Sequence, residues 1–209
     1  MKKSHWRFVA VLAIVVFAAV STASASAAVW HVGGAELKGT DALTLTAPIV
    51  EKIKIESIGL AEECSSEQME LKGASITTGA GGKIEHLVFN GCKSNVSQCP
   101  LSSTKIETKP LTVTASLGKK SPEDTLLLKP TTGTVFAVYF YEGENCPLAS
   151  EQVLKGTIKV ILPKGQEEHA EMEFNPLSEG SELQGNSASV SLRGKAKVKL
   201  TSGLAWSFH

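Results

Sequence analysis

The sequence predicts an all-β protein, and we expect an antiparallel β-sandwich, with barrel-like closure of the sheets as an open alternative. Three observations carry this prediction. The 209 residues include 18 glycines and 8 prolines, which leave little room for long helices. Between these residues, apolar and polar side chains alternate in short segments rich in β-branched residues, the pattern of strands with one buried face. The 4 cysteines are typical of a disulfide framework.

The predicted strands follow one another with turn residues between them. In the first, 49–56, Ile49, Ile53 and Ile55 share one face. Residues 135–141 form the most apolar segment, and we expect a central strand there. Only residues 61–71 have a composition that could form a short helix. The remaining strands are expected at 84–89, 111–115, 125–128, 153–162, 170–174, 188–192 and 195–200.

One short pattern recurs along the chain. Leucine, a basic residue and glycine follow one another at 37–39, 71–73, 154–156 and 192–194. The spacing between the copies is not constant, which excludes a solenoid. We interpret the pattern as a turn that the protein uses repeatedly, and an ancient duplication of a strand–turn–strand unit is the alternative.

The first 27 residues predict an export signal. A basic start precedes the uncharged apolar run Phe8–Val20, and small residues with the Ala-x-Ala form follow it. The run is shorter than the about 20 apolar residues of a membrane span. We expect cleavage after Ala27, with Ala25 as the alternative, and a single disulfide-stabilised β-sandwich domain over 28–209.

The expected mature chain is nearly neutral. Loss of Lys2, Lys3 and Arg7 lowers the basic count from 21 to 18, against 21 acids, a formal charge of −3. This mixed charge gives no basic footprint for nucleic acid or for anionic membrane, and no second apolar run reaches the length of a membrane span. We therefore expect a secreted, extracellular or envelope-associated protein that is not integral to the membrane and binds no nucleic acid.

The cysteines predict two intramolecular disulfides, for which three pairings are possible. Cys92 and Cys99 flank a short polar loop and would close easily. Cys64 and Cys146 would then tie an early strand to a central one, and we favour this pairing. The rival is a four-cysteine zinc site, which the absence of a C-x2-C spacing disfavours.

Several motifs occur in a fixed order between residues 49 and 160. They are Phe-Asn-Gly-Cys at 89–92, Ile-Glu-Thr-Lys-Pro-Leu at 106–111, Leu-Lys-Pro-Thr-Thr-Gly at 128–133 and Val-Leu-Lys-Gly at 153–156. With the cysteines, this order resembles a group of uncharacterised small exported four-cysteine β-proteins of soil actinobacteria. The resemblance implies export and the cysteine framework but no active-site residue. The segment 141–145 departs from the group's pattern and puts the pairing of Cys146 in doubt.

Signs of catalysis or metal binding are few, and we expect no cofactor and no metal. The histidines beyond the signal show no H-x-H or H-E-x-x-H spacing, and the sequence has no G-x-S-x-G motif. One constellation stands out, because Glu171 and Glu173 share a face of the predicted strand 170–174. Their α-carbons should lie about 6.6 Å apart, within the about 5–9.5 Å that separates the paired carboxylates of glycosidases.

Two functions from different classes follow. The first is an exported non-enzymatic β-domain, a binding, envelope-associated or structural module of unknown ligand, because the scaffold signals are strong and the catalytic ones are weak. A cell-envelope or glycan component is one candidate partner. The alternative is a secreted polysaccharide hydrolase that uses Glu171 and Glu173 as its carboxylate pair.

Overall fold

The computed structural model describes residues 28–57, 59–65, 69–117, 123–148, 151–163, 168, 170–174, 181–186 and 188–209. The predicted export signal, 1–27, lies outside the described residues. The described part is all-β, and its antiparallel sheets pack in a sandwich-like arrangement. The fold class predicted from the alternating pattern is therefore confirmed.

The largest sheet closes on itself. Antiparallel pairs run from β3 through β6, β7, β11, β12, β14, β15 and β17, and β17 pairs with β3 again. Closure leaves few free strand edges along the ring. The strands of this sheet are β3 (Thr40–Ser57), β4 (Leu60–Cys64), β6 (Ser75–Thr77), β7 (Gly81–Ile84), β9 (Lys93–Ser94), β11 (Leu111–Ser116), β12 (Glu123–Pro130), β13 (Val135–Phe140), β14 (Glu151–Pro163), β15 (Ala170–Phe174), β16 (Glu182–Gln184) and β17 (Ser189–Leu200).

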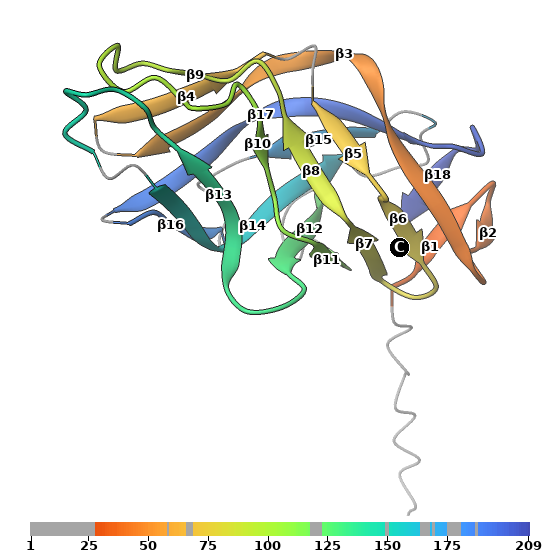
Figure 1. The fold of residues 1–209 in the computed structure, drawn as a ribbon. Helices are drawn as coiled ribbons and strands as arrows, with labels where there is room; N and C mark the ends of the chain where they lie inside the picture. Colours follow the sequence, from red (N-terminus) through yellow and green to blue (C-terminus); the bar gives the residue numbers. More distant parts are fainter. Residues whose placement is uncertain are drawn as a thin grey trace, which may run out of the picture.

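Two small sheets complete the described fold. One consists of β18 (Trp206–Phe208), β1 (Trp30–Val32) and β2 (Ala35–Glu36), and the other of β10 (Ile106–Glu107), β8 (His86–Phe89) and β5 (Glu70–Lys72). Figure 1 shows β1, β2 and β18 at one end of the molecule and β4, β9, β13 and β16 at the other. The groove described below lies at this second end.

The core follows the alternation of the strands. In β11, Leu111, Val113 and Ala115 are buried and the threonines between them are exposed. In β15, Ala170, Met172 and Phe174 face inward in the same way. At the end that carries β1 and β18, Trp30 packs against Trp206 and Phe208 at ring distances of 5.7 and 4.9 Å. The small sheet of β1 and β18 therefore joins the same core.

Four predicted elements differ from the structure. The possible helix over 61–71 is not formed, since its described residues belong to β4 and β5 or lie between them. Residues 135–141, expected as a central strand, give β13, whose partner among the described strands is β14 alone. The expected strands 188–192 and 195–200 are one strand, β17. Segment 84–89 is split between β7 and β8 at Glu85. The reason for the first difference is tertiary pairing, because β4 lies between β3 and β9 and this overrides a local helical preference.

The recurring leucine–base–glycine pattern is not always a turn. Gly39 precedes β3 and Gly73 follows β5, but Gly156 and Gly194 lie inside β14 and β17. At Gly156, β14 exchanges β13 for β12 as its neighbour, and at Gly194, β17 shows a register shift against β3. The φ angles of these two glycines are 112° and 137°, in the region that other residues rarely adopt. In the long strands, the pattern therefore marks a bend between sheets.

The disulfides are Cys64–Cys92 and Cys99–Cys146. The predicted pairs Cys92–Cys99 and Cys64–Cys146 were wrong, although all four cysteines are bonded as expected. β9 begins directly after Cys92 and pairs with the end of β4, which brings Cys92 beside Cys64. Two disulfides indicate an oxidising, extracellular-type environment.

The second bridge has a similar origin. The segment that follows Cys99 runs along the chain that precedes Cys146, with a bridge between Leu101 and Tyr141 and a hydrogen bond from Glu142 N to the Pro100 carbonyl oxygen of 2.8 Å. Each disulfide therefore joins two backbone segments that already lie in contact. No disulfide links Cys92 to Cys99 across the loop 93–98.

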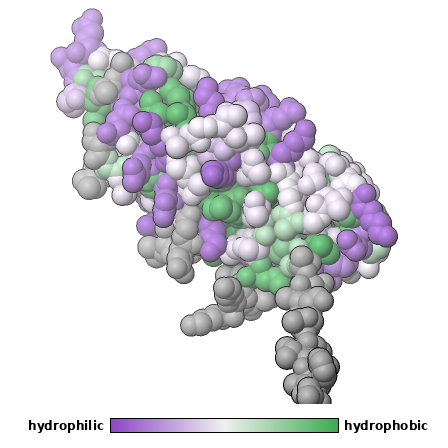
Figure 2. Space-filling view, turned by 90° about the horizontal axis from the view of Figure 1, so that it is seen from below, coloured by the Kyte–Doolittle hydropathy of each residue, from purple (hydrophilic) through white to green (hydrophobic). Residues whose placement is uncertain are grey.

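The described surface is mixed in polarity. On the face in Figure 2, hydrophobic areas lie between hydrophilic ones and form no single broad patch within its described part. The large exposed hydrophobic residues among those described are Leu117, Phe140 and Leu204. Single apolar residues of this kind are normal on soluble domains.

Candidate functional site

A groove opens where the ends of β3, β16 and β17 meet β4, β13 and β14. Its wide part has a volume of about 540 Å³ and is bordered by residues of β3, β16 and β17. A narrower part of about 170 Å³ reaches Tyr139 on β13 and Gln152 on β14. Ser57 and Val190 line both parts, so the two parts adjoin at these residues. The wide part has the volume of a small-molecule site, about 300–1,000 Å³.

Strand register brings polar side chains to the groove. Ser189 pairs with Gln184 across β16 and β17, and Ser191 pairs with Glu56 across β17 and β3. A hydrogen bond of 2.8 Å from Gly185 N to the carbonyl oxygen of Ala188 holds the connection between β16 and β17. Hydroxyl and amide groups from separate strands therefore line one concave surface.

Fixed charge in the groove is largely paired. Arg193 Nε lies 3.1 Å from the Glu56 carboxylate, and both residues line the wide part. Glu182 is a further exposed carboxylate on β16. The groove thus offers hydrogen-bonding groups and one ion pair rather than a concentration of charge of one sign.

A buried polar cluster lies behind the narrow part of the groove. Tyr139 lines the groove, and its ring meets that of Tyr141 edge to face at 5.7 Å. The Tyr141 hydroxyl donates a hydrogen bond to Glu62 Oε1. Glu62 is only 1% exposed, so its carboxyl group depends on hydrogen bonds within the protein, that from Tyr141 first among them.

Burial controls the acidity of this cluster. Burial raises the pKa of Glu62, and hydrogen bonds from Tyr141 and Tyr139 only partly oppose this change. Burial also raises the pKa of both tyrosines, and the nearby Glu62 adds to the effect. The tyrosines therefore remain protonated and able to donate to Glu62.

Glu62 is not among the residues predicted from the sequence, because 61–71 has the composition of a possible helix. In a strand, Glu62 and Cys64 lie on one face, and Cys64 is buried. The pattern of alternation about Cys64, read as a strand, would have placed a carboxyl group in the core. A buried carboxyl group is rare enough to mark a site of interest.

We expect Glu62→Gln to improve stability relative to the wild type as pH rises. A folded-state pKa raised above the unfolded value contributes stability that is present below the unfolded pKa and is lost as pH rises through the folded pKa. Glutamine removes this loss, so its effect on the free energy of unfolding should be more favourable at about pH 7 than at about pH 4. Urea unfolding at both pH values measures it.

The neighbouring Glu63→Gln is the matched control with the opposite sign. Lys52 lowers the pKa of Glu63, which is exposed at the surface, and Lys54 adds to the change. The stability from Glu63 is present above its unfolded pKa and is lost as pH falls through the folded pKa. Its removal should therefore matter more at about pH 7 than at about pH 4. If both variants respond to pH in the same direction, the assignment of Glu62 is refuted.

The predicted carboxylate pair lies elsewhere, on the outer face of β15. Glu171 and Glu173 share that face as expected, and Lys195 of β17 sits between them at 3.6 and 3.4 Å. The two carboxylates raise the pKa of Lys195, Glu173 having the larger effect. Neither glutamate lines the groove, and Lys195 takes the space between the carboxylates that a scissile bond would need.

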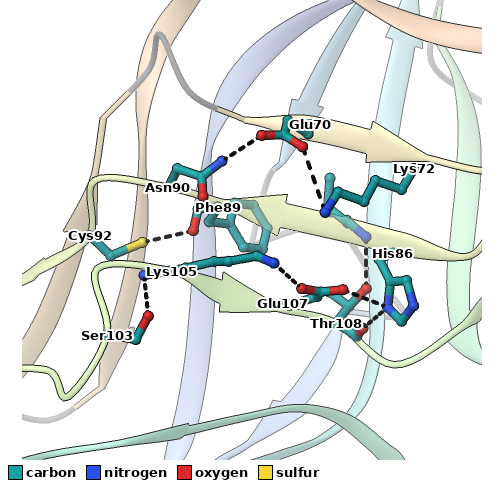
Figure 3. Close-up of polar contacts among 11 residues, drawn as sticks. Glu70, Lys72, His86, Phe89, Asn90, Cys92, Ser103, Lys105, Glu107 and Thr108 are labelled. Atoms are coloured by element: carbon teal, nitrogen blue, oxygen red, sulfur yellow. Dashed lines mark hydrogen bonds and ion pairs between the residues drawn. The ribbon is translucent and has the colours of Figure 1, made fainter.

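A second polar cluster covers the sheet of β5, β8 and β10. Figure 3 shows its side chains pointing toward one another across the three strands. His86 Nδ1 lies 2.8 Å from the Thr108 carbonyl oxygen and 3.2 Å from Glu107 Oε1. Lys105 binds the same carboxylate and lowers the pKa of Glu107. The described contacts join His86 to these groups and to no nucleophile, so the network orders the surface of this sheet.

Two further results concern metals and membranes. Within the described ranges, no group of three or more His, Cys, Asp or Glu residues is arranged to hold a metal ion. The described residues include no helix long and apolar enough to cross a membrane.

His31 and His209 stack at a ring distance of 4.0 Å, and His169 lies outside the described residues.

Comparison with known proteins adds no relative. No family model, no curated protein and no solved structure matches the chain.

Proposed function

We propose that the chain is an exported, non-enzymatic β-domain that binds a ligand through the groove at the β3–β16–β17 end. The groove supports this proposal because it gathers recognition groups from separate strands, among them Ser57, Gln184 and Ser189. Its ion pair of Glu56 and Arg193 ties up one carboxylate beside these groups. Such an arrangement suits selective binding more than acid–base chemistry, which needs a group poised to transfer a proton.

Export is part of the proposal. The first 27 residues have the three-part pattern of a signal peptide, and the two disulfides fit an oxidising compartment. The resemblance to exported four-cysteine proteins of soil actinobacteria agrees with this location. A secreted or envelope-associated binding module is the function that joins these observations.

We expect the mature protein to bind insoluble cell-envelope polysaccharide without cleaving it. The test mixes purified protein with this material and measures co-sedimentation and newly formed reducing ends. The wild type should sediment with the polysaccharide, and reducing ends should stay at the level of the protein-free blank. The double variant Glu171→Gln/Glu173→Gln should sediment as the wild type does, because these residues lie away from the groove.

The hydrolase alternative makes the opposite prediction. It requires release of reducing ends by the wild type and loss of that release in the double variant, by about 100-fold or more for a general acid or base. That result would replace the binding proposal. Failure of the wild type to sediment with any envelope fraction would also contradict it.

A further inference from the structure

The polar groups of the groove can both donate and accept hydrogen bonds. Ser57, Ser189 and Ser191 supply hydroxyls, and Gln184 supplies an amide. A hydroxyl donates one bond and accepts two, and an amide offers both donors and an acceptor. Ligand hydroxyl groups have the same double character, so they match this lining without a fixed charge on either side.

The charge of the groove disfavours an anionic ligand. The guanidinium of Arg193 is engaged by Glu56 at 3.1 Å, and Glu182 adds a negative charge to the same wall. An anion would have to compete with one carboxylate and face a second. Complementarity of charge sets which ligands a surface selects, and here it favours a neutral one.

The strand edge beside the groove is closed to an added peptide strand. The Asn186 side chain donates from Nδ2 to the Glu151 carbonyl oxygen at 2.6 Å, and its Oδ1 accepts from Val153 N at 3.2 Å. These are the backbone groups of β14 that an extended peptide would need for strand addition. Asn186 therefore favours recognition by side chains over pairing with a partner backbone.

The narrow part of the groove adds an apolar wall. Tyr139 lines it together with Leu60 and Leu154. Tyr139 is 7% exposed, and its ring packs edge to face against Tyr141 at 5.7 Å. The wall beside the wide part of the groove is therefore apolar.

We propose that the wide part of the groove binds a neutral oligosaccharide, with sugar hydroxyls on the Ser189, Ser191 and Gln184 side chains. This inference rests on the proposed function and names its ligand class. A sugar has both properties that the groove matches, since its hydroxyls are donors and acceptors and its C–H faces are apolar. The polar groups of the site then select ligands that carry hydroxyls at matching places.

The test uses soluble probes and three variants of the mature protein. Cellohexaose and chitohexaose are the neutral probes, an oligogalacturonate of equal length is the anionic one, and an alternating threonine–valine peptide represents strand addition. Ser189→Tyr fills the groove, and Gln184→Leu keeps its shape but removes an amide. Thr114→Tyr is the matched control, because Thr114 is exposed on β11 and does not line the groove.

We expect a neutral probe to shift the backbone amide signals of groove residues in nuclear magnetic resonance spectra. Ser189→Tyr and Gln184→Leu should each weaken its binding by about tenfold or more, and Thr114→Tyr should leave it within about twofold. Urea unfolding confirms that each variant is folded. Binding that Ser189→Tyr leaves unchanged would overturn the assignment to the groove.

The probes also separate this inference from the proposed function. If the peptide or the anionic probe shifts the groove signals and the neutral sugars do not, the sugar assignment is wrong and the binding function stands. If no probe shifts the groove signals and no envelope polysaccharide retains the protein, both are wrong.

Discussion

Replacing Cys99 and Cys146 together by alanine is expected to lower the free energy of unfolding by about 4 kcal/mol, because the bridge constrains a long loop of the unfolded chain. The two cysteines are 47 residues apart in sequence. Replacing Cys64 and Cys92, which are 28 residues apart, should cost nearly as much, about 3.5 kcal/mol. Urea unfolding followed by the fluorescence of the buried Trp30 and Trp206 measures both values.

The additivity of the two costs is specific to this pairing. The loops closed by the two bridges follow one another in sequence and do not overlap, so the effects should add when all four cysteines are replaced. Under either alternative pairing, each double replacement would remove one cysteine from both bridges and so break both. The variant that lacks all four cysteines would then lose no more stability than either double variant, and that result would contradict the structure.

Gly156→Ala is the substitution of a single residue with the largest expected cost, about 3–5 kcal/mol. A β-carbon at this position would lie 1.8 Å from the Glu182 carbonyl oxygen, and φ is +112°. The backbone strain and the close contact both add to the loss of stability. The contact is not easily relieved, because β16 is held by β14 on one side and β17 on the other. The same urea titration reports the loss.

Gly133→Ala is the matched control for this prediction. Gly133 also has a positive φ, +66°, but a β-carbon there would meet no atom within 4 Å. It should lose about 1 kcal/mol from backbone strain alone. Equal losses at Gly133 and Gly156 would show that the approach of β16 to β14 does not matter, and would contradict the account of the bend.

The strands that could be predicted from the sequence are those with a clear local pattern. Alternation placed β11, β12 and β15 correctly, because a strand with one buried face shows its period in the sequence. At Gly194, the local pattern does not distinguish a bend within a strand from a turn. It was interpreted as a turn, and 188–200 was divided into two strands, but the backbone continues through the glycine as a bend. Glycine is found both at a positive φ inside a strand and in a turn, so the residue type alone does not distinguish the two.

The disulfide pairing depended on contacts that local patterns do not contain. Cys92 lies beside Cys64 because β9 pairs with β4, and Cys146 lies near Cys99 because Leu101 meets Tyr141. These contacts join segments far apart in sequence. The short loop between Cys92 and Cys99, taken as one strand-to-strand connection, favoured a bridge between its ends, but the fold pairs each of these cysteines with another partner.

The groove is a product of the same long-range pairing. Glu56, Gln184 and Ser189 come from three strands, and only the register of β16 and β17 with β3 places them on one surface. The predicted carboxylates, in contrast, were close in sequence and did fall on one face of β15. Sequence proximity located Glu171 and Glu173, but the cation between them, Lys195, belongs to another strand.

The protein is a scaffold held by Cys64–Cys92 and Cys99–Cys146, on which the groove is built, and we propose that it is exported. Mass spectrometry of protein recovered outside the producing cells and digested without reduction checks both points at once. We expect a chain that begins at Ala28 and two disulfide-linked peptides with these pairings. A linked Cys92–Cys99 peptide, free thiols, or a chain that retains Phe8–Val20 would contradict it.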